Sequence, residues 1–422
     1  MRILSVSRVS PGMRLAQTVY SSHEGVRQAL LTRGVALNQA MIDALRRAGV
    51  FAIYVEDGLS EGIRAAGPIS DRTRREAVRS LATVFASAQG HGRTRVPEEQ
   101  VAHLEGIVGK ILGEVRSSGS LLSFLDDLGS FDAYTLTHSI NVCVLGLMIG
   151  DAAMRADGWR DYRGMRRRDD IDARLGKLGL GLLLHDVGKV VVPQSVLTKP
   201  GRLTDDEMDM IRQHPEAGAM LVEGGSVSAL ARAVIIGHHE RWDGRGYPHG
   251  KRREEIHLHA RIAAVADVYD AVSSDRVYRM RRPSHEAYEL VLGSAGSAFD
   301  PALVKVFSRV VAPYPVGTAV VLSTGERGLV AENHADNCTR PTVRITHDPA
   351  GAPLAHPDEI NLVDHLSVTV VDSVEDPGDP LDAAPPLPEV EHAEVLADLS
   401  IDDALVVGPR RVVDAQVGEH LG

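Results

Sequence analysis

The sequence is poor in cysteine and lacks long apolar runs. Cys143 and Cys338 are its two cysteines, too few for a disulfide framework, which favours a cytoplasmic location. Apolar runs such as residues 141–150 are shorter than the roughly 20 residues that a membrane span requires, so we expect no membrane span. The opening residues, MRILSVSRVSPG, contain no apolar stretch of the length that a signal peptide needs.

The sequence also lacks a surplus of positive charge. Its net charge is −11, and residues 372–403 contain eleven acidic residues but no Lys or Arg. The remaining 46 acidic residues are balanced by 46 Lys and Arg. This balance excludes a broad basic surface for DNA, although it leaves room for a local pocket that receives an anion.

Aromatic residues make up only 4% of the chain, so the core must be mostly aliphatic. With 422 residues and 44% hydrophobic content, the chain is long enough for two or three domains. Residues 1–60 alternate short β-like runs (MRILSV, AQTVYS, FAIYVED) with a helical stretch at 39–48, which predicts a small N-terminal α/β accessory unit.

The middle of the chain is predicted to be helical. Amphipathic stretches predict connecting helices within residues 61–116, and a helical domain follows at 117–313. TDDE at 204–207 has the pattern of a capping box, and Pro215 suits the first turn of a helix that would begin near His214.

The end of the chain changes character twice. GTAVVLS, RGLVAEN and PTVRITH predict a small β-rich unit at 314–371, and the proline and acid content of 372–422 predicts a largely disordered acidic tail. The expected fold is therefore multidomain and mainly α: an all-helical core with a small N-terminal α/β unit and a small C-terminal β-rich unit.

Polar residues at helical positions suggest chemistry. His138 shares a stripe with apolar residues, where a lone histidine is more often a hydrogen-bonded core residue. Asp186 resists such an explanation, because a carboxylate on a buried face is costly unless it is paired or binds a metal. Asp267 repeats this anomaly on another apolar helix, with Asp270 on the same face one turn later.

Five histidines join these carboxylates as candidate metal ligands. Imidazole and carboxylate together suit Fe, Mn or Zn and leave room for substrate oxygens. Seven ligands are too many for one tetrahedral ion, so we expect at least two metals, about 4 Å apart. The seven candidates are His138, His185, Asp186, His214, His238, His239 and Asp267.

Two metals suggest phosphate-ester hydrolysis, because a bridging hydroxide can attack phosphorus while the ions stabilise the developing charge. Lys189 could neutralise a phosphate oxygen, although a solvated surface lysine is the ordinary alternative. In HHERWDGRGYP (238–248), Gly244 and Gly246 permit a tight turn that would hold Tyr247 in place. Glu240 and Asp243 of this stretch also have the character of metal ligands, and Tyr247 could equally be a packing residue.

Together these motifs resemble the HD-GYP subgroup of HD-type metal phosphohydrolases, which degrade cyclic di-GMP. The resemblance rests on HDVGK at 185–189 with HHERWDGRGYP downstream, supported by YTLTHSINV, QHPEAGA and RIAAVADVYDAVSSDRVYR. It covers about 200 residues. It implies a metal-dependent phosphodiesterase in second-messenger signalling that hydrolyses the 3',5'-phosphodiester to pGpG, GMP or both.

The resemblance implies roles residue by residue. The seven candidates above become ligands of two divalent transition metal ions, Fe or Mn, with Asp186 bridging and with His185, Asp186 and Lys189 forming the catalytic group. Asp270 is expected to orient a ligand. The substrate contacts implied are Lys189, Tyr247, Arg276 and Arg279.

Two features depart from the family pattern. Members with a third metal have a glutamate where this sequence has Tyr134, which favours two metals over three and leaves the second cleavage open. Extra charged residues at 157–172 are expected to form a surface loop.

Other readings remain open. The substrate could be another cyclic dinucleotide, such as cyclic GMP-AMP, or the chain could bind cyclic di-GMP without turnover and signal by docking a partner. Diguanylate cyclases or other signalling proteins are candidate partners, and a homodimer is left open. The sequence does not indicate what the N-terminal unit senses.

Overall fold

The computed structural model describes residues 1–23, 26–48, 50, 52–64, 67–89, 96–118, 131–161, 163–199, 201–274, 283–335 and 337–379. Side chains are not described at residues 20–28 and 131–134. Arg276, Arg279, the side chain of Tyr134 and residues 380–422 of the predicted tail therefore lie outside the described part of the chain.

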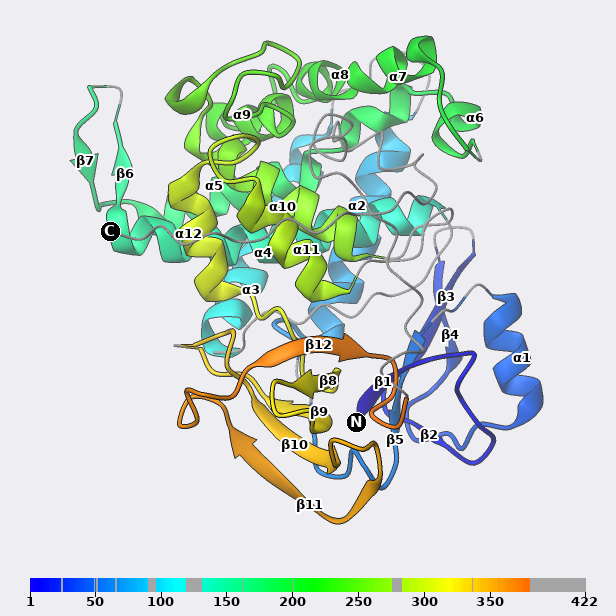
Figure 1. Ribbon diagram of the computed structural model, residues 1–422. Coiled ribbons are helices and arrows are strands. Elements are labelled where there is room, and N and C mark those ends of the chain that lie inside the picture. Colours follow the sequence, from blue (N-terminus) through cyan, green and yellow to red (C-terminus); the bar gives the residue numbers. More distant parts are fainter. Residues whose placement is uncertain are drawn as a thin grey trace.

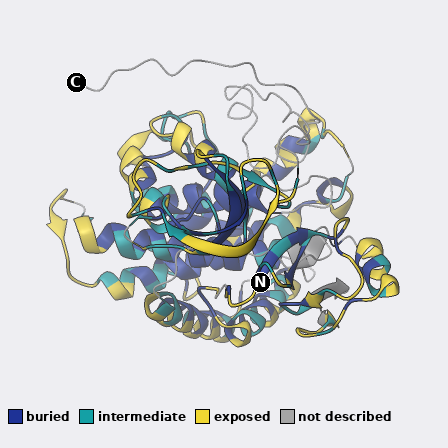
Figure 2. Cartoon of the chain, turned by 60° about the horizontal axis from the view of Figure 1, so that its bottom comes forward, coloured by how far each residue is buried: buried dark blue, intermediate teal, exposed yellow. Residues whose placement is uncertain are grey.

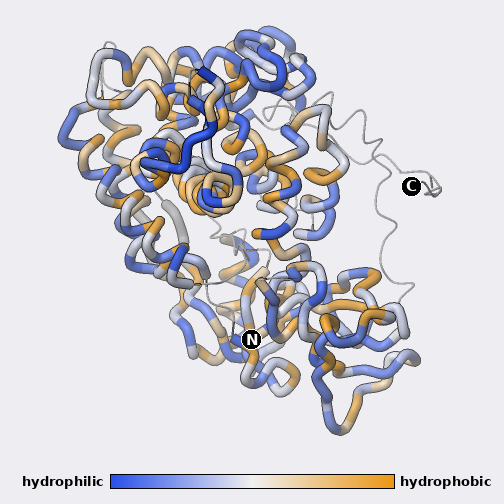
Figure 3. Tube along the Cα trace, turned by 90° about the vertical axis from the view of Figure 1, so that its left-hand side faces the viewer, coloured by the Kyte–Doolittle hydropathy of each residue, from blue (hydrophilic) through white to orange (hydrophobic). Residues whose placement is uncertain are grey.

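A helical body forms one end of the molecule, and two small β-containing units lie together at the other end (Figures 1 and 3). The body contains α2 (Asp71–Ala88), α3 (Glu98–Ser118), α4 (Phe131–Asp157), α5 (Ile171–Leu184), η1 (Val187–Val191), α6 (Gln194–Leu197), α7 (Asp205–Arg212), α8 (His214–Leu221), α9 (Ala229–Gly237), η2 (Arg253–Glu255), α10 (Leu258–Ser273), α11 (Ser284–Gly293) and α12 (Pro301–Val310). The mainly helical core with two flanking units is thus confirmed.

Helix α4 is the centre of the helical body. It packs against α2, α3, α5, α10 and α12, and its residues 138–147 are all buried. Figure 2 shows buried residues, in dark blue, gathered in the interior of the protein. The apolar run of residues 141–150 is by itself too short for a membrane span, but it belongs to one continuous helix of 27 residues. By length and composition its residues Thr135–Asp157 could cross a membrane, and 78% of the apolar window is buried inside the protein. Such burial is typical of a core helix.

Local signals set the helix ends as predicted. Thr204 and Glu207 form the reciprocal capping box that begins α7, and Pro215 lies in the first turn of α8, which starts at His214. The predicted surface loop at 157–172 is instead a short hairpin of β6 (Trp159–Arg160) and β7 (Arg166–Arg167), which projects from the body (Figure 1). Its charged side chains pair within the hairpin region, for example Arg167 with Asp161.

The N-terminal unit contains two sheets and one helix. An antiparallel sheet has the order β1-β5-β2, a hairpin pairs β3 with β4, and α1 packs through Ile42 and Leu45 into the core of the unit. The elements are β1 (Arg2–Ser5), β2 (Arg14–Leu15), β3 (Val19–His23), β4 (Val26–Leu31), α1 (Gln39–Arg47) and β5 (Ala52–Glu56).

The C-terminal unit is a five-stranded antiparallel sheet with the order β11-β10-β9-β8-β12. Its strands are β8 (Ala319–Leu322), β9 (Arg327–Glu332), β10 (Thr342–His347), β11 (Pro353–Asn361) and β12 (Val370–Val374). Strand β12 continues past residue 371, where the β-rich unit was expected to end, because it completes the sheet by pairing with β8.

The two small units contact each other directly. The Ile3 amide donates to the Gly317 carbonyl, and Ile63 packs in one apolar cluster with Ala319 and Leu329. The buried Arg2 bridges Asp57 of the first unit and Asp376, which follows β12. The two flanks of the sequence therefore meet in space although the whole helical body separates them along the chain.

Candidate metal centre

His185 and Asp186 lie at the junction between α5 and η1, inside the helical body. His185 is the residue that ends α5, and its Nδ1 lies 2.7 Å from the Leu182 carbonyl oxygen. This hydrogen bond fixes the ring, and the carbonyl can only accept, so Nδ1 carries the proton and Nε2 presents a lone pair. A neutral imidazole held this way has the tautomer that a metal ligand requires.

His214 and His238 are oriented by the same device. The Nδ1 of His214 lies 2.8 Å from the Ile211 carbonyl oxygen, and that of His238 lies 2.9 Å from the Ile235 carbonyl oxygen. Each ring is thus anchored to the helix or turn that precedes it, with Nε2 directed inward.

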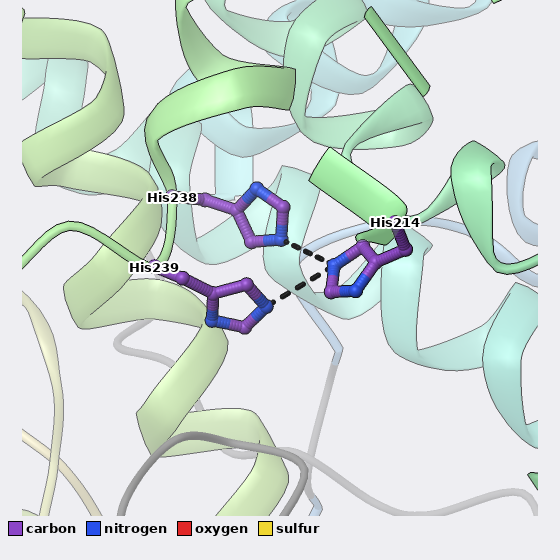
Figure 4. A group of neighbouring side chains, drawn as sticks. All are labelled: His214, His238 and His239. Atoms are coloured by element: carbon purple, nitrogen blue, oxygen red, sulfur yellow. Dashed lines mark hydrogen bonds between the residues drawn. The ribbon is translucent and has the colours of Figure 1, made fainter. Parts of the chain in front are cut away.

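The inward-facing nitrogens meet in one place. The Nε2 of His214 lies 3.2 Å from the Nε2 of His238 and 3.2 Å from that of His239, both of which point toward it (Figure 4). Since the Nδ1 atoms of His214 and His238 are committed to carbonyls, their Nε2 lone pairs face each other. A cation between them would convert this repulsion into coordination.

His138 enters the centre from α4, outside the segment that carries the other histidines. Its Nδ1 lies 2.6 Å from Asp270 Oδ2, and its Nε2 lies 3.0 Å from Asp267 Oδ1. Burial alone would lower the pKa of His138, but the hydrogen bonds to the two carboxylates outweigh burial and raise it to about 9. Asp270 therefore holds the ring by the contact expected of a residue that orients a ligand.

All seven candidate ligands are brought together and each is at most 5% exposed. Their donor atoms form three overlapping groups within which the atoms lie no more than 4.8 Å apart. The groups are His138, His185 and Asp186; His185, His238 and Asp267; and His214, His238 and His239. Because His185 and His238 each belong to two groups, the three form one continuous donor set.

The donor set fits a metal because the protein leaves some of its atoms without partners. Among the described residues, the buried His185 Nε2 and Asp267 Oδ2 have no hydrogen-bond partner. A buried polar atom without a partner typically costs 1–3 kcal/mol, which is tolerated mainly where function requires it. Imidazole nitrogens and carboxylate oxygens are ligands that Fe, Mn and Zn accept.

The histidines are electrostatically suited to bind a cation at neutral pH. Burial, followed by the charges of His185 and His214, lowers the pKa of His238 to about 3. Burial also holds the pKa of His239 well below its usual value, with the charges of His238 and His214 acting in the same direction. Both rings are therefore neutral, the state in which imidazole coordinates a metal.

The carboxylates are ionised under the same conditions. Burial would raise the pKa of Asp267, but the hydrogen bond and charge of His138 outweigh it and bring the pKa to about 2. Burial is likewise outweighed at Asp186 by the charges of His185 and Lys189, which hold its pKa well below the usual range. The centre thus combines the neutral rings of His238 and His239 with anionic carboxylates, whereas the raised pKa of His138 keeps that ring protonated in the metal-free protein.

Close backbone packing brings the ligands of η1 and α8 together. A Cβ added at Gly188 would lie 1.9 Å from the His214 carbonyl oxygen and 2.5 Å from the Gly218 amide nitrogen. No side chain fits there, so the glycine of HDVGK permits the approach that places Asp186 beside His214, with 3.5 Å between Oδ1 and Nε2. The sequence showed this glycine only as part of the motif.

The two described substrate-contact candidates flank the donor set. The Nζ of Lys189 lies 3.0 Å from Asp186 Oδ2, and the Lys189 side chain is 19% exposed. The ring of Tyr247 stacks on His239 with 4.6 Å between the centroids. Tyr247 therefore packs on a candidate ligand, whereas the sequence left packing and substrate contact equally open.

Glu240 and Asp243 do not join the donor groups, contrary to the metal-ligand character suggested by their sequence position. Glu240 accepts hydrogen bonds from the amides of His249 and Lys251, and Asp243 pairs with Arg241. Both carboxylates stabilise the loop that follows His239. The structure thus separates these two carboxylates from His238 and His239, although all four residues lie within positions 238–243 of the sequence.

Parts of the chain match known families. Residues 164–303 match the HD domain family, and residues 319–377 match a family described as a KOW domain associated with HD domain. The second match covers the five strands of the C-terminal sheet. The first includes six of the seven candidate ligands but not His138, which lies before the matched residues and which the structure brings to the other six.

The chain is 39% identical over 245 residues to the Cyclic di-GMP phosphodiesterase PA4108 of Pseudomonas aeruginosa, which covers 58% of this chain and 55% of that protein. It is 43% identical over 134 residues to a Cyclic di-GMP phosphodiesterase of Vibrio cholerae, covering 30% and 27% of the two chains. It is also 36% identical over 125 residues to the 3'3'-cGAMP-specific phosphodiesterase 2 of Vibrio cholerae, covering 29% and 24%. This chain thus spans about half the length of the first relative and about a quarter of the other two.

Among solved structures, Bd1817, a HDG"Y"P protein from Bdellovibrio bacteriovorus, is similar over 72% of this chain and 97% of that chain. Its TM-score is 0.41 and its sequence identity is 14%. This similarity is too distant to support an argument about function.

Proposed function

We propose that this chain, which carries an HD domain of the HD-GYP type, is a metal-dependent phosphodiesterase that hydrolyses cyclic di-GMP. The observation that carries the proposal is the buried set of seven His and Asp side chains whose donor atoms lie close together. Two of these atoms, His185 Nε2 and Asp267 Oδ2, have no hydrogen-bond partner among the described residues. This chain is similar over part of its length to proteins whose names describe phosphodiesterases of cyclic dinucleotides, which supports the reaction class.

The proposed cofactor is a pair of divalent Fe or Mn ions. Three overlapping donor groups suit more than one ion, and Tyr134 in place of a glutamate favours two ions over three. Bound ions would supply an activated nucleophile and stabilise the charge that develops on phosphorus. Asp186 shares a donor group with His138 and lies close to His214, so it is the proposed bridging ligand.

The residues of the chain would bind the substrate and place its phosphate beside the ions. Lys189 is ion-paired to Asp186 at the edge of the centre, where its ammonium group can meet a non-bridging phosphate oxygen. Tyr247, Arg276 and Arg279 are the proposed contacts to the remaining phosphate and the bases. Asp270 keeps the His138 ring in register through its hydrogen bond to Nδ1.

Cyclic di-GMP is proposed over cyclic GMP-AMP because the similarity to one cyclic di-GMP phosphodiesterase extends over 245 residues at 39% identity, whereas that to the cyclic GMP-AMP enzyme extends over 125 at 36%. We also propose a cytoplasmic location, where thiols stay reduced, because neither of the buried residues Cys143 and Cys338 forms a disulfide.

The deciding experiment incubates the full chain, loaded anaerobically with Fe or Mn, with cyclic di-GMP and separates pGpG and GMP by chromatography over time. Formation of either product supports the proposal, and a stop at pGpG fits two ions. Cyclic GMP-AMP is tested in parallel. Protein with measured metal that cleaves neither substrate, yet binds cyclic di-GMP, would overturn the enzyme assignment in favour of a binding protein.

A further inference from the structure

Glu240, which follows the two adjacent histidines, is a buried carboxylate outside the metal centre. It is 3% exposed, and its two oxygens accept hydrogen bonds from two different backbone amides. The His249 amide donates to Oε1 and the Lys251 amide donates to Oε2, both at 2.9 Å. Glu240 thereby helps to close the loop of residues 241–248, together with the backbone hydrogen bonds from Tyr247 to His239 and from Arg253 to Trp242.

Inside this loop, residues 246 and 247 return to the backbone of the ligand segment. A Cβ added at Gly246 would lie 2.4 Å from the His239 carbonyl oxygen and 2.6 Å from the Glu240 Cα. The next amide, that of Tyr247, donates to the same His239 carbonyl at 3.2 Å. This contact turns the Tyr247 ring onto His239 at an interplanar angle of 23°.

We propose that Glu240 is a positioning residue, which holds Tyr247 in register with His239 and thereby shapes the side of the centre that receives the cyclic dinucleotide. The inference rests on the proposed function, because it treats Tyr247 as a substrate contact. Glu240 acts through the backbone of 249–251 and does not touch the ions or the substrate.

The chemistry of the carboxylate explains why a glutamate is needed. Two backbone N–H groups face Glu240, so the site requires two acceptors and no donor. Glutamine has the same shape but one acceptor and one NH₂ donor, which leaves one amide without a partner and opposes it to another donor. Glu240→Gln is therefore a change of hydrogen bonding with little change of volume.

The test is a double-mutant cycle in the full, metal-loaded chain. Glu240→Gln is expected to raise the KM for cyclic di-GMP about tenfold, with a smaller change in kcat and unchanged metal content. In a Tyr247→Ala background the same substitution is expected to change KM less than about twofold, because the contact that Glu240 positions is already lost. Equal factors in the two backgrounds would overturn the proposal.

Glu254→Gln is the matched control, since Glu254 is an exposed glutamate on η2 close to the same loop in sequence. It is expected to leave KM, kcat and metal content at the wild-type values. A rise in KM like that of Glu240→Gln would show that the effect is not particular to the buried carboxylate.

Amide hydrogen exchange separates this inference from the proposed function, because it requires no turnover. Glu240→Gln is expected to speed exchange of the amides of His249, Lys251 and also Tyr247. Faster exchange at 249 and 251 with Tyr247 unchanged would overturn the positioning role even if the wild-type chain cleaves no cyclic dinucleotide. If Glu240→Gln does not fold, Gly246→Ala should give the same raised KM and faster Tyr247 exchange, and normal values there would overturn the proposal.

Discussion

Two of the regions where the described residues bury charge treat it in opposite ways. At the junction between the two small units, Arg2 is 5% exposed and pairs with Asp57 at 2.8 Å and with Asp376 at 2.6 Å. In the metal centre, the His214 and His238 nitrogens face each other, and Asp267 Oδ2 has no hydrogen-bond partner in the part of the chain that the structure describes. The junction contains its own counter-charges, whereas the centre is arranged for a cation from outside.

This difference teaches how to tell structural polar groups from functional ones. Buried charges that serve stability are paired, because an unpaired charge costs several kcal/mol. Metal-binding nitrogen and oxygen atoms that lie together without hydrogen-bond partners destabilise the fold until a bound ion neutralises them. Changes in the centre should therefore act first on metal and activity, and changes at the junction should act on stability alone.

The largest effect is expected from His185→Ala and from Asp186→Ala. Each removes a candidate ligand from the donor set, so the losses in metal content and turnover should exceed the roughly 10- to 100-fold typical of outer residues that only orient ligands. Metal analysis and phosphodiesterase assays provide the measurements. Asp243→Asn is the control with normal metal content, and a metal-loaded, active His185→Ala variant would refute the site.

A smaller effect on the same region is expected from Gly188→Ala. The added Cβ would overlap the His214 carbonyl, so η1 must move away from α8, and we expect about 10-fold weaker metal binding with lower thermal stability. Gly176→Ala is the matched control, because nothing lies within 4 Å of the added Cβ at this helical position. Metal titration of both variants tests the comparison, and equal affinities would contradict it.

Acidification should separate the two regions without mutation. The pKa of His238 is about 3 in the folded chain, below its ordinary 6.5, so the unfolded chain binds more protons as the pH falls below 6.5. The metal-free protein should therefore lose stability between about pH 6.5 and pH 4, by a few degrees in Tm. His138, with a pKa raised from 6.5 to about 9, keeps its contribution below about pH 6.5 and loses it as the pH rises from there through about 9.

The pair of Arg2 and Asp376 at the junction should not respond in that pH range. The pKa of Asp376 is lowered from 3.8 despite burial, by hydrogen bonds from the Gly378 amide and Arg2, so its contribution is lost only in stronger acid. Thermal unfolding of metal-free protein at pH 7, 5.5 and 4.5 gives the measurement. A Tm that stays constant or rises on acidification would contradict the assignment.

The smallest effect on activity is expected at the junction. Arg2→Met leaves Asp57 and Asp376 unpaired and should lower the free energy of unfolding by roughly 2 to 4 kcal/mol, with metal content and kcat unchanged. Arg8→Met is the control: Arg8 is 40% exposed and its pair with Glu375 should contribute less than about 1 kcal/mol. A loss of metal in Arg2→Met would show that the two regions are coupled.

Much of the helical body could be predicted because its signals are local. The capping box of Thr204 and Glu207 and the helix start at His214 depend on neighbours within one turn, and both lie as expected. Asp186 and Asp267 could be named as candidate ligands because a carboxylate on an apolar helix face is costly without a partner, and the five histidines joined them as residues of the types that bind metals. Their convergence is seen only in the folded chain, as are the carbonyl contacts that orient His185, His214 and His238.

Other features could not be predicted from local patterns. The hairpin at 159–167 is charged on both strands and has no apolar stripe, so its residues resembled a loop. Strand β12 lies where acidic residues begin and was assigned partly to the tail, because an exposed edge strand needs no hydrophobic alternation.

The sequence by itself determined which residues could be metal ligands and where the helices that carry them lie, because helix caps and apolar stripes depend on neighbours a few residues away. Only the tertiary structure decided that Asp267 completes the metal centre while Glu240 does not: His138, the partner of Asp267, lies on another helix, and the folded loop brings two backbone amides to Glu240. The pairing of Arg2 with Asp376, 374 residues away, belongs to the same class. A buried polar group is defined by what faces it, and packing supplies that partner.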